Sequence, residues 1–313
     1  MSACLALCLI AQPTFSRTTF TPSEKRQQLL ARIVNVDVPR DQSTLLTSLA
    51  NLKVKIMQND PVLKRCSRPD CTLALGNPRK TERPPLVFMF GDSHVHMWLP
   101  AVYSALIRKK VTLRVSWAPG CPAALVHLWG VFNGAKYGET CDAWRDQTKS
   151  RILQAKPDYV ILAERTSTLF TGPDQRLDGP TLRSGLENTI RYFQSGGAKV
   201  VVIADTPPFA NWLYPSMCVS VNMTTLTRCQ TTVVSSSPDF ESLGGSEALA
   251  AQSTGANFID PTWWLCEKVT QRCPSVIDDK LIYRDSNHIA FEASYGLADL
   301  MSSSLLPILT LVK

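Results

Sequence analysis

The residues that could carry out nucleophilic chemistry lie in two short stretches far apart in the chain. The stretch "LVFMFGDSHVHMWL" begins at Leu86 and places Ser93 directly after a strongly apolar run. The stretch "YRDSNHIAF" begins at Tyr283 and places Asp285 three residues before His288. A serine hydroxyl becomes a nucleophile when an imidazole takes its proton and a carboxylate fixes the tautomer of that imidazole. Together the two stretches supply these three groups.

Each stretch alone also fits an ordinary structural role. Serine and aspartate are common in turns and at helix N-caps, so "GDS" can be a simple strand-to-helix turn. Asp285 can likewise cap a helix that carries His288 at the surface. A hydroxyl at the start of a helix would lie near the positive end of the helix dipole, which favours a developing anion. The combination of the two stretches is therefore more specific than either one.

Other polar and aromatic residues near these stretches have simpler interpretations. His94 and His96 flank the serine, but neighbouring side chains at a helix start point apart, so we expect packing or capping roles. Asp92 is expected to hold the turn by hydrogen bonds. Tryptophans that could stack on a sugar ring are interpreted as core or pocket wall: Trp98, Trp144, Trp263 and Trp264.

The elements that must position these residues can be read from the hydrophobic pattern. Apolar strand candidates begin at residues 86, 111, 159, 199 and 257, and helix candidates cover residues 97–109, 142–155, 181–195, 241–253 and 288–305. Apolar strands that alternate with helices predict an α/β fold, a three-layer α/β/α domain with a central, mostly parallel sheet. Active groups collect at the carboxyl ends of such strands, where Ser93 lies.

Composition and charge divide the 313 residues into three parts. A hydrophobic content of 44% is enough for a sizeable core, which we expect in residues 86–313. Residues 1–85 hold 13 Lys and Arg against 6 Asp and Glu, whereas the remainder is balanced. Residues 17–85 are therefore expected to be a basic linker or extension, with an amphipathic helix around residues 45–57. A neutral body gives no support to nucleic-acid binding.

The first 16 residues form a short apolar run without a preceding basic residue. The run is too short to span a bilayer and matches a three-part signal peptide poorly. Two interpretations stay open: a weak signal, or the remainder of a truncated membrane segment.

Eight of the ten cysteines fall into near pairs along the chain. The pairs are Cys66 with Cys71, Cys121 with Cys141, Cys218 with Cys229, and Cys266 with Cys273. Short separations suit local disulfides and an oxidising compartment. The alternative is buried thiols or a metal site, but the chain has no Cys-x-x-Cys and no histidine at zinc-finger spacing, so no metal is expected.

The order of these motifs resembles the SGNH (GDSL-like) hydrolases, whose fold is flavodoxin-like. The similarity is strongest to the extracytoplasmic SGNH domain fused to membrane O-acyltransferases of the acyltransferase-3 family, which modify bacterial surface polysaccharides. It covers about residues 66–308. The segments that carry it are "FMFGDSHVHMWLPAV", "APGCPAAL", "CDAWR", "PDYVILAER", "VVVIADTPPF", "FIDPTWWLCEKVTQRCP" and "LIYRDSNHIAFEASYGLA".

The resemblance implies a role for each matching residue. Ser93 would be the nucleophile, His288 its general base and then acid, and Asp285 the group that fixes the imidazole. The backbone N–H groups of Gly120 and Ser93 would form an oxyanion hole. The family's third donor is an asparagine after the third strand, but "LAERTSTL" has none. Arg165 could replace it or recognise substrate; the alternative is an ordinary ion pair with Glu164 or another acid.

These features predict an extracytoplasmic serine-dependent O-acyltransferase that needs no cofactor. Its partners would be an acyl donor, a glycan acceptor and a membrane acyltransferase domain or partner protein, with O-acetyl transfer to a cell-surface polysaccharide as the expected reaction. The same resemblance implies a periplasmic or cell-surface location, with membrane association through a missing or truncated N-terminal segment. Two alternatives stay open: a carbohydrate O-acetyl esterase with the same triad, and a non-catalytic glycan-binding domain.

Overall fold

The computed structural model describes residues 20–37, 45–46, 60–67, 70–76, 83–130, 135–167, 169–209, 214–233 and 240–311. The apolar run at residues 1–16 and most of the helix expected at residues 45–57 lie outside the described residues.

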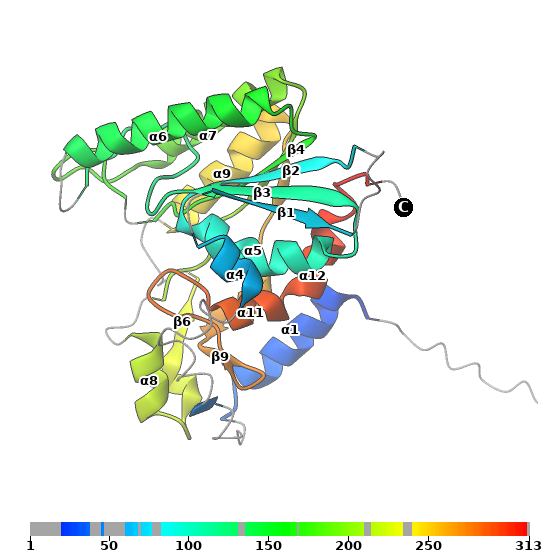
Figure 1. Cartoon of the computed structure of the whole chain (residues 1–313). Coiled ribbons are helices and arrows are strands. Elements are labelled where there is room, and N and C mark those ends of the chain that lie inside the picture. The colour runs from blue at the N-terminus through cyan, green and yellow to red at the C-terminus, as the bar shows by residue number, and fades with distance from the viewer. Residues whose placement is uncertain are drawn as a thin grey trace, which may run out of the picture.

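A six-stranded sheet forms the centre of the molecule (Figure 1). Its strands, in spatial order, are β1 (Asp70–Leu75), β3 (Val111–Trp117), β2 (Leu86–Gly91), β4 (Tyr159–Ala163), β5 (Lys199–Ile203) and β7 (Asn257–Ile259). The last five are parallel and are the five strands expected from sequence, whereas β1 pairs with β3 in antiparallel fashion. The predicted fold class is therefore confirmed.

Helices cover both faces of this sheet (Figure 1). One face carries α6 (Ala135–Gln154), α7 (Gly179–Ser195) and α9 (Phe240–Thr254); the other carries α5 (Ser93–Leu106), α11 (Phe291–Gly296) and α12 (Ala298–Leu305). Side chains alternate along β2 because successive residues of a strand point to opposite faces. Val87 and Met89 join the core under α5, while Phe88 and Phe90 join the core under α7. A strand buried on both sides is apolar throughout for this reason.

Parts of the expected extension pack against the body. The structure places α1 (Pro22–Ile33), α4 (Pro61–Arg65) and β1 in residues 17–85. Leu30, Leu63 and Leu73 are buried in the same core as the side chains of α5. The Arg26 side chain also donates a hydrogen bond of 2.7 Å to the carbonyl of Trp264. The described segments of this region are thus packed against the body, and the division of the chain into an extension at residues 17–85 and a domain at residues 86–313 stays a prediction.

Short elements precede the loop that holds Asp285 and His288. They are α8 (Pro215–Val221), a 3-10 helix (Leu226–Cys229), β6 (Gln230–Thr232), α10 (Thr262–Leu265), β8 (Arg272–Pro274), β9 (Val276–Ile277) and β10 (Lys280–Leu281). A β-bridge between Tyr283 and Ile289 closes the loop. The N–H of Phe209 donates a hydrogen bond of 2.7 Å to the carbonyl of Ser286, which fixes the loop beside the segment that follows β5.

The strand register brings the functional loops to one edge of the sheet. Gly91 at the end of β2 pairs with Trp117 at the end of β3 and with Ala163 at the end of β4. The residues that follow these three strands therefore leave the sheet at one level. Among the described residues, no helix combines the length and the apolar character that a membrane span requires.

Candidate active site

Ser93 is the first residue of α5 and follows a turn that only glycine can enter. A Cβ at Gly91 would collide with the carbonyl oxygen of Ala163 on β4, and its φ of 152° is rare for other residues. Asp92 is the N-cap of α5, where its carboxylate accepts a hydrogen bond of 2.8 Å from the N–H of His94. Close packing of β2 on β4 and the helix cap together present the serine at the sheet edge.

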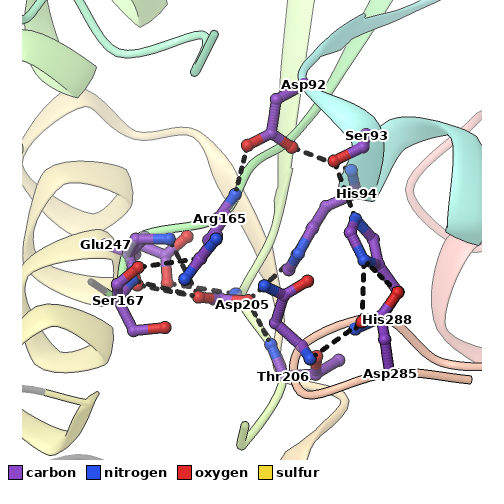
Figure 2. A network of polar contacts seen from close by, with 12 residues as sticks. Asp92, Ser93, His94, Arg165, Ser167, Asp205, Thr206, Glu247, Asp285 and His288 are labelled. Atoms are coloured by element: carbon purple, nitrogen blue, oxygen red, sulfur yellow. Dashed lines mark hydrogen bonds and ion pairs between the residues drawn. The ribbon is translucent and has the colours of Figure 1, made fainter. Parts of the chain in front are cut away.

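The side chains of Ser93, His288 and Asp285 form a continuous hydrogen-bonded chain (Figure 2). The Oγ of Ser93 lies 2.8 Å from the Nε2 of His288. The Nδ1 of His288 lies 2.9 Å from each carboxylate oxygen of Asp285. A carboxylate accepts only, so Nδ1 carries the proton and Nε2 is left to accept from the serine hydroxyl. This arrangement can deprotonate Ser93 for attack on a carbonyl carbon.

Asp285 is fixed by its own loop. Its Oδ1 accepts hydrogen bonds from the backbone N–H groups of Asn287, at 3.0 Å, and His288, at 2.8 Å. Partial burial acts to raise the pKa of Asp285, but the hydrogen bonds from His288 and these two N–H groups outweigh it and hold the pKa well below its usual value. Asp285 is therefore an anion throughout the physiological range.

Burial lowers the pKa of His288, which suits a residue that must be neutral to act as a base. Removal from water lowers the pKa of His288, and the charge of His94 lowers it further, whereas Asp285 acts in the opposite direction; the net pKa lies below the ordinary histidine value. The imidazole is thus neutral at neutral pH and can accept a proton from Ser93.

Gly120 lies in the loop that follows β3, beside the turn of Ser93. The N–H of Ala118 donates a hydrogen bond of 3.2 Å to the carbonyl of Gly91 at the start of this loop. Gly120 has a φ of +66°, and a Cβ there would collide with the hydroxyl of Tyr137, which itself donates to the carbonyl of Pro119. The loop conformation therefore favours a glycine at this position.

Arg165 makes contacts different from the ion pair with Glu164 that was one alternative. Its backbone N–H donates to the Oδ2 of Asp92 at 2.9 Å, and its Nε donates to the carbonyl of Ser167 at 2.9 Å. Glu164, the acid proposed as a partner, is buried and accepts a hydrogen bond of 2.7 Å from the N–H of Ala124 instead. The Arg165–Glu164 pair is thus absent, and a role for Arg165 as donor or in recognition remains a prediction.

The neighbours of Ser93 on α5 are buried in different environments. His96 stacks on Trp117 with ring centroids 4.7 Å apart, and burial lowers its pKa to about 4. His94 is 1% exposed, and its Nδ1 forms an ion pair of 3.0 Å with Asp205. Trp98 is also fully buried, where it packs against Trp264.

Two buried carboxylates beside the site were missed from sequence. Asp205 lies just beyond β5, which ends at Ile203, and Glu247 lies on α9; both are buried. Figure 2 shows Asp205 between His94 and the loop after β4. The position of Asp205 just beyond an apolar strand is a signal that could have identified it. Glu247 has no such signal, because it lies within an ordinary helical pattern.

The four near pairs of cysteines form disulfides in the structure: Cys66–Cys71, Cys121–Cys141, Cys218–Cys229 and Cys266–Cys273. The second joins the loop of Gly120 to α6. No group of three or more His, Cys, Asp or Glu side chains in the described part of the chain is arranged to hold a metal ion.

Comparison with known proteins identifies one matching family model and several structures with a similar fold. A sequence model described as "SGNH domain (fused to AT3 domains)" matches residues 57–303. The periplasmic domain of a lipopolysaccharide acetyltransferase from Salmonella ser. Paratyphi A is similar in structure, with a TM-score of 0.57 and 11% identity over 73% of this chain and 84% of that chain. No curated protein matches the sequence.

Two further structures match less closely. The acetyl xylan esterase AlAXEase has a TM-score of 0.42 and 13% identity over 70% of this chain and 99% of that chain. A GDSL-like lipase from Bacteroides thetaiotaomicron has a TM-score of 0.44 and 12% identity over 75% of this chain and 93% of that chain.

Proposed function

This chain belongs to the family of SGNH domains that are fused to AT3 domains, and on that premise we propose that it is a serine-dependent O-acyltransferase. The substrate we propose is an acyl donor, with acetyl as the group transferred and a hydroxyl of a cell-surface polysaccharide as the acceptor. The single observation that carries the proposal is the hydrogen-bonded chain from Ser93 through His288 to Asp285.

The reaction would proceed in two balanced steps. In the first, the Oγ of Ser93 bonds to the acyl carbon while the Nε2 of His288 takes the hydroxyl proton; the leaving group then departs with that proton, and an acyl-serine remains. In the second, His288 takes the proton of an acceptor hydroxyl, whose oxygen attacks the acyl carbon. Breakage of the ester bond to Ser93 returns the proton to its Oγ.

The negative oxygen formed in each step needs hydrogen-bond donors. We propose the backbone N–H groups of Ser93 and Gly120, because the first lies at the start of α5 and the second in the adjoining loop after β3. The dipole of α5 adds a favourable field at its N-terminus. Loss of one such donor costs on the order of 3 kcal/mol of transition-state stabilisation, so the donor that replaces the family's asparagine matters. Arg165 is our candidate.

Two further observations support the proposed location of the protein and the proposed source of the acyl group. Four disulfides favour an extracytoplasmic location, since thiols stay reduced in the cytosol. Fusion of the family's domains to AT3 domains favours a membrane acyltransferase domain or partner as the source of the acyl group.

Covalent labelling tests the proposal directly. The protein is mixed with p-nitrophenyl acetate, and intact mass and release of nitrophenol are followed with wild type, Ser93→Ala and Ser220→Ala. Ser220 is an exposed serine on α8 and serves as the matched control. We expect an acetyl adduct or turnover in wild type and Ser220→Ala only. Equal labelling of Ser93→Ala, or none in wild type, would overturn the nucleophile assignment.

Competition between acceptors separates transfer from hydrolysis. Water and a sugar hydroxyl attack the same acyl-serine, so the triad alone does not select between them. We expect added polysaccharide fragments to divert the acetyl group from water, as measured by acetylated glycan per nitrophenol released. If glycan never captures the group, the protein is an esterase.

A further inference from the structure

His94 is a buried histidine that the proposed reaction does not use. It follows Ser93 on α5, and its side chain is 1% exposed. The Nδ1 lies 3.0 Å from the Oδ1 of Asp205, which is an ion-pair distance, but neither ring nitrogen has an aligned hydrogen-bond partner among the described residues. The interaction of His94 with Asp205 is therefore an ion pair at short range.

Asp205 is surrounded by donors that favour its charged form. Its Oδ2 accepts from the N–H of Thr166 at 2.9 Å, from the hydroxyl of Thr166 at 3.0 Å and from the N–H of Ser167 at 3.4 Å, and its Oδ1 accepts from the N–H of Thr206 at 2.7 Å. Burial opposes this charge, but His94 and the donors prevail and lower the pKa of Asp205. A cation beside a buried anion stabilises it, and His94 lies in that position.

The His94 ring lies directly against the proposed catalytic histidine. The ring centroids of His94 and His288 are 5.0 Å apart, with an angle of 59° between the planes. Figure 2 shows His94 between Asp205 and His288. His288 thus has two neighbours of opposite effect: the carboxylate of Asp285 at Nδ1 and the ring of His94 beside it.

We propose that His94, held in its protonated form by Asp205, is a positioning residue that supports the ring of His288 and keeps it neutral until Ser93 gives up its proton. The role given to His288 here rests on the proposed function. Two positive rings 5 Å apart repel in a poorly solvated site, so a charged His94 disfavours a second charge on His288. His94 would limit the rise in basicity that Asp285 causes.

Other ionisable groups act on these two rings and on Asp205. Asp92 before α5 and Arg165 after β4 act on His94, and His96 on α5 and Arg284 and Asp285 before α11 act on His288. Glu247 on α9 and Tyr283 before α11 act on Asp205. Burial raises the pKa of Glu247 well above its usual value, so Glu247 is neutral. Asp205, not Glu247, is therefore the anion that pairs with His94. Burial acts to lower the pKa of His94, and Asp205 more than compensates, so the net shift is upward.

The wild-type protein provides the first test. The chain has only four histidines, so NMR titration of isotope-labelled imidazoles is tractable, with assignment from single glutamine variants. As pH rises, we expect His288 to lose its proton before His94 does. If His94 is neutral over the range in which His288 titrates, the proposal is wrong.

Variants provide the second test. In His94→Gln the positive neighbour is removed, so we expect the pKa of His288 to rise and the acid limb of kcat/KM to move to higher pH by the same amount. The double variant His94→Gln with Asp205→Asn leaves no unpaired buried charge, and we expect the same direction. His127→Gln is the control, because His127 is exposed and pairs with Asp142 away from the triad. An unchanged His288 pKa in a folded variant contradicts the proposal.

The titrations need no acyl transfer, so the two proposals fail separately. Absence of a Ser93-dependent acetyl adduct would overturn the proposed function while the histidine pKa values still report on His94. A neutral His94 would overturn the present inference while leaving the acetyl adduct unaffected.

Discussion

The Oδ2 of Asp92 accepts a hydrogen bond of 2.9 Å from the backbone N–H of Arg165 and thereby ties the loop after β4 to the turn that presents Ser93. Its Oδ1 at the same time accepts from the N–H of His94 as the cap of α5. One buried carboxylate thus joins two neighbouring strand ends across the sheet. Asp92 therefore caps α5 and also holds together the two loops that border the site.

Replacement of Asp92 should therefore reduce both stability and activity. Asp92→Ala leaves two N–H groups without an acceptor in a buried site, which we expect to cost about 1–3 kcal/mol in the free energy of unfolding, measured by urea denaturation. We expect turnover of p-nitrophenyl acetate to fall at least tenfold, because the turn of Ser93 loses its anchor. Asp178→Ala removes the exposed cap of α7 and is the matched control. It should lose about 1 kcal/mol and keep its turnover.

Asp285→Asn should remove catalysis while leaving the fold intact. An asparagine amide can donate to Nδ1 of His288, which would move the proton to Nε2 and leave no acceptor for Ser93. We expect a loss of about 10³- to 10⁴-fold in kcat, the size seen when a triad carboxylate is exchanged in this way. Steady-state kinetics and circular dichroism on the same sample separate lost chemistry from lost folding. Activity within tenfold of wild type would show that Asp285 does not fix the imidazole.

The same variant should alter the dependence of stability on pH. The folded pKa of Asp285 lies below its unfolded value, so its contribution is complete above an unfolded pKa of about 3.9 and is lost as pH falls through the folded pKa. Acid unfolding followed by fluorescence should therefore show less loss of stability below about pH 4 in Asp285→Asn than in wild type. Identical acid profiles would contradict the lowered pKa.

The pattern along the sequence was sufficient for the sheet but not for its edge. Strands such as β2 and β4 are apolar throughout because both faces are covered, and this signal is strong. β1 reads "DCTLAL", with exposed and buried residues mixed, since it is an edge strand held by pairing with β3 and by the Cys66–Cys71 disulfide. Its position therefore depends on long-range contacts that a local pattern does not contain.

In the candidate site, too, residues with local sequence signals could be predicted and long-range contacts could not. Ser93, Asp285 and His288 stand out because a serine after a strand and an Asp-x-x-His before a helix are local signals, and the fold places them together. The partners of His94 and Glu164 are Asp205 and Ala124, which lie far away in the chain and approach only through the strand order. Buried polar contacts between strand ends can thus be identified only from the three-dimensional structure.

Glu164 should make the protein less stable as pH rises. Burial raises the pKa of Glu164 to about 8, above an unfolded value of about 4.3, so the folded state holds a proton that the unfolded state has released. Stability should therefore fall between about pH 4.3 and pH 8. In Glu164→Gln this contribution is absent, and the amide oxygen can still accept from the N–H of Ala124. The midpoint of thermal unfolding should fall less for the variant than for wild type as pH rises toward 8. If the two midpoints change in parallel with pH, Glu164 is not protonated in the folded protein.

The Cys121–Cys141 disulfide should be needed for activity as well as stability. It closes a separation of 20 residues, for which loop entropy gives about 3 kcal/mol, and it joins the loop of Gly120 to α6. Cys121→Ser with Cys141→Ser should therefore lower the free energy of unfolding by about that amount and reduce turnover of p-nitrophenyl acetate. The matched control is Cys218→Ser with Cys229→Ser, which opens a separation of 11 residues in the separate small core. It should lose stability but retain turnover per folded molecule. Equal turnover in both double variants would show that the loop of Gly120 is held by its other contacts, which include the hydrogen bond from Ala124 to Glu164.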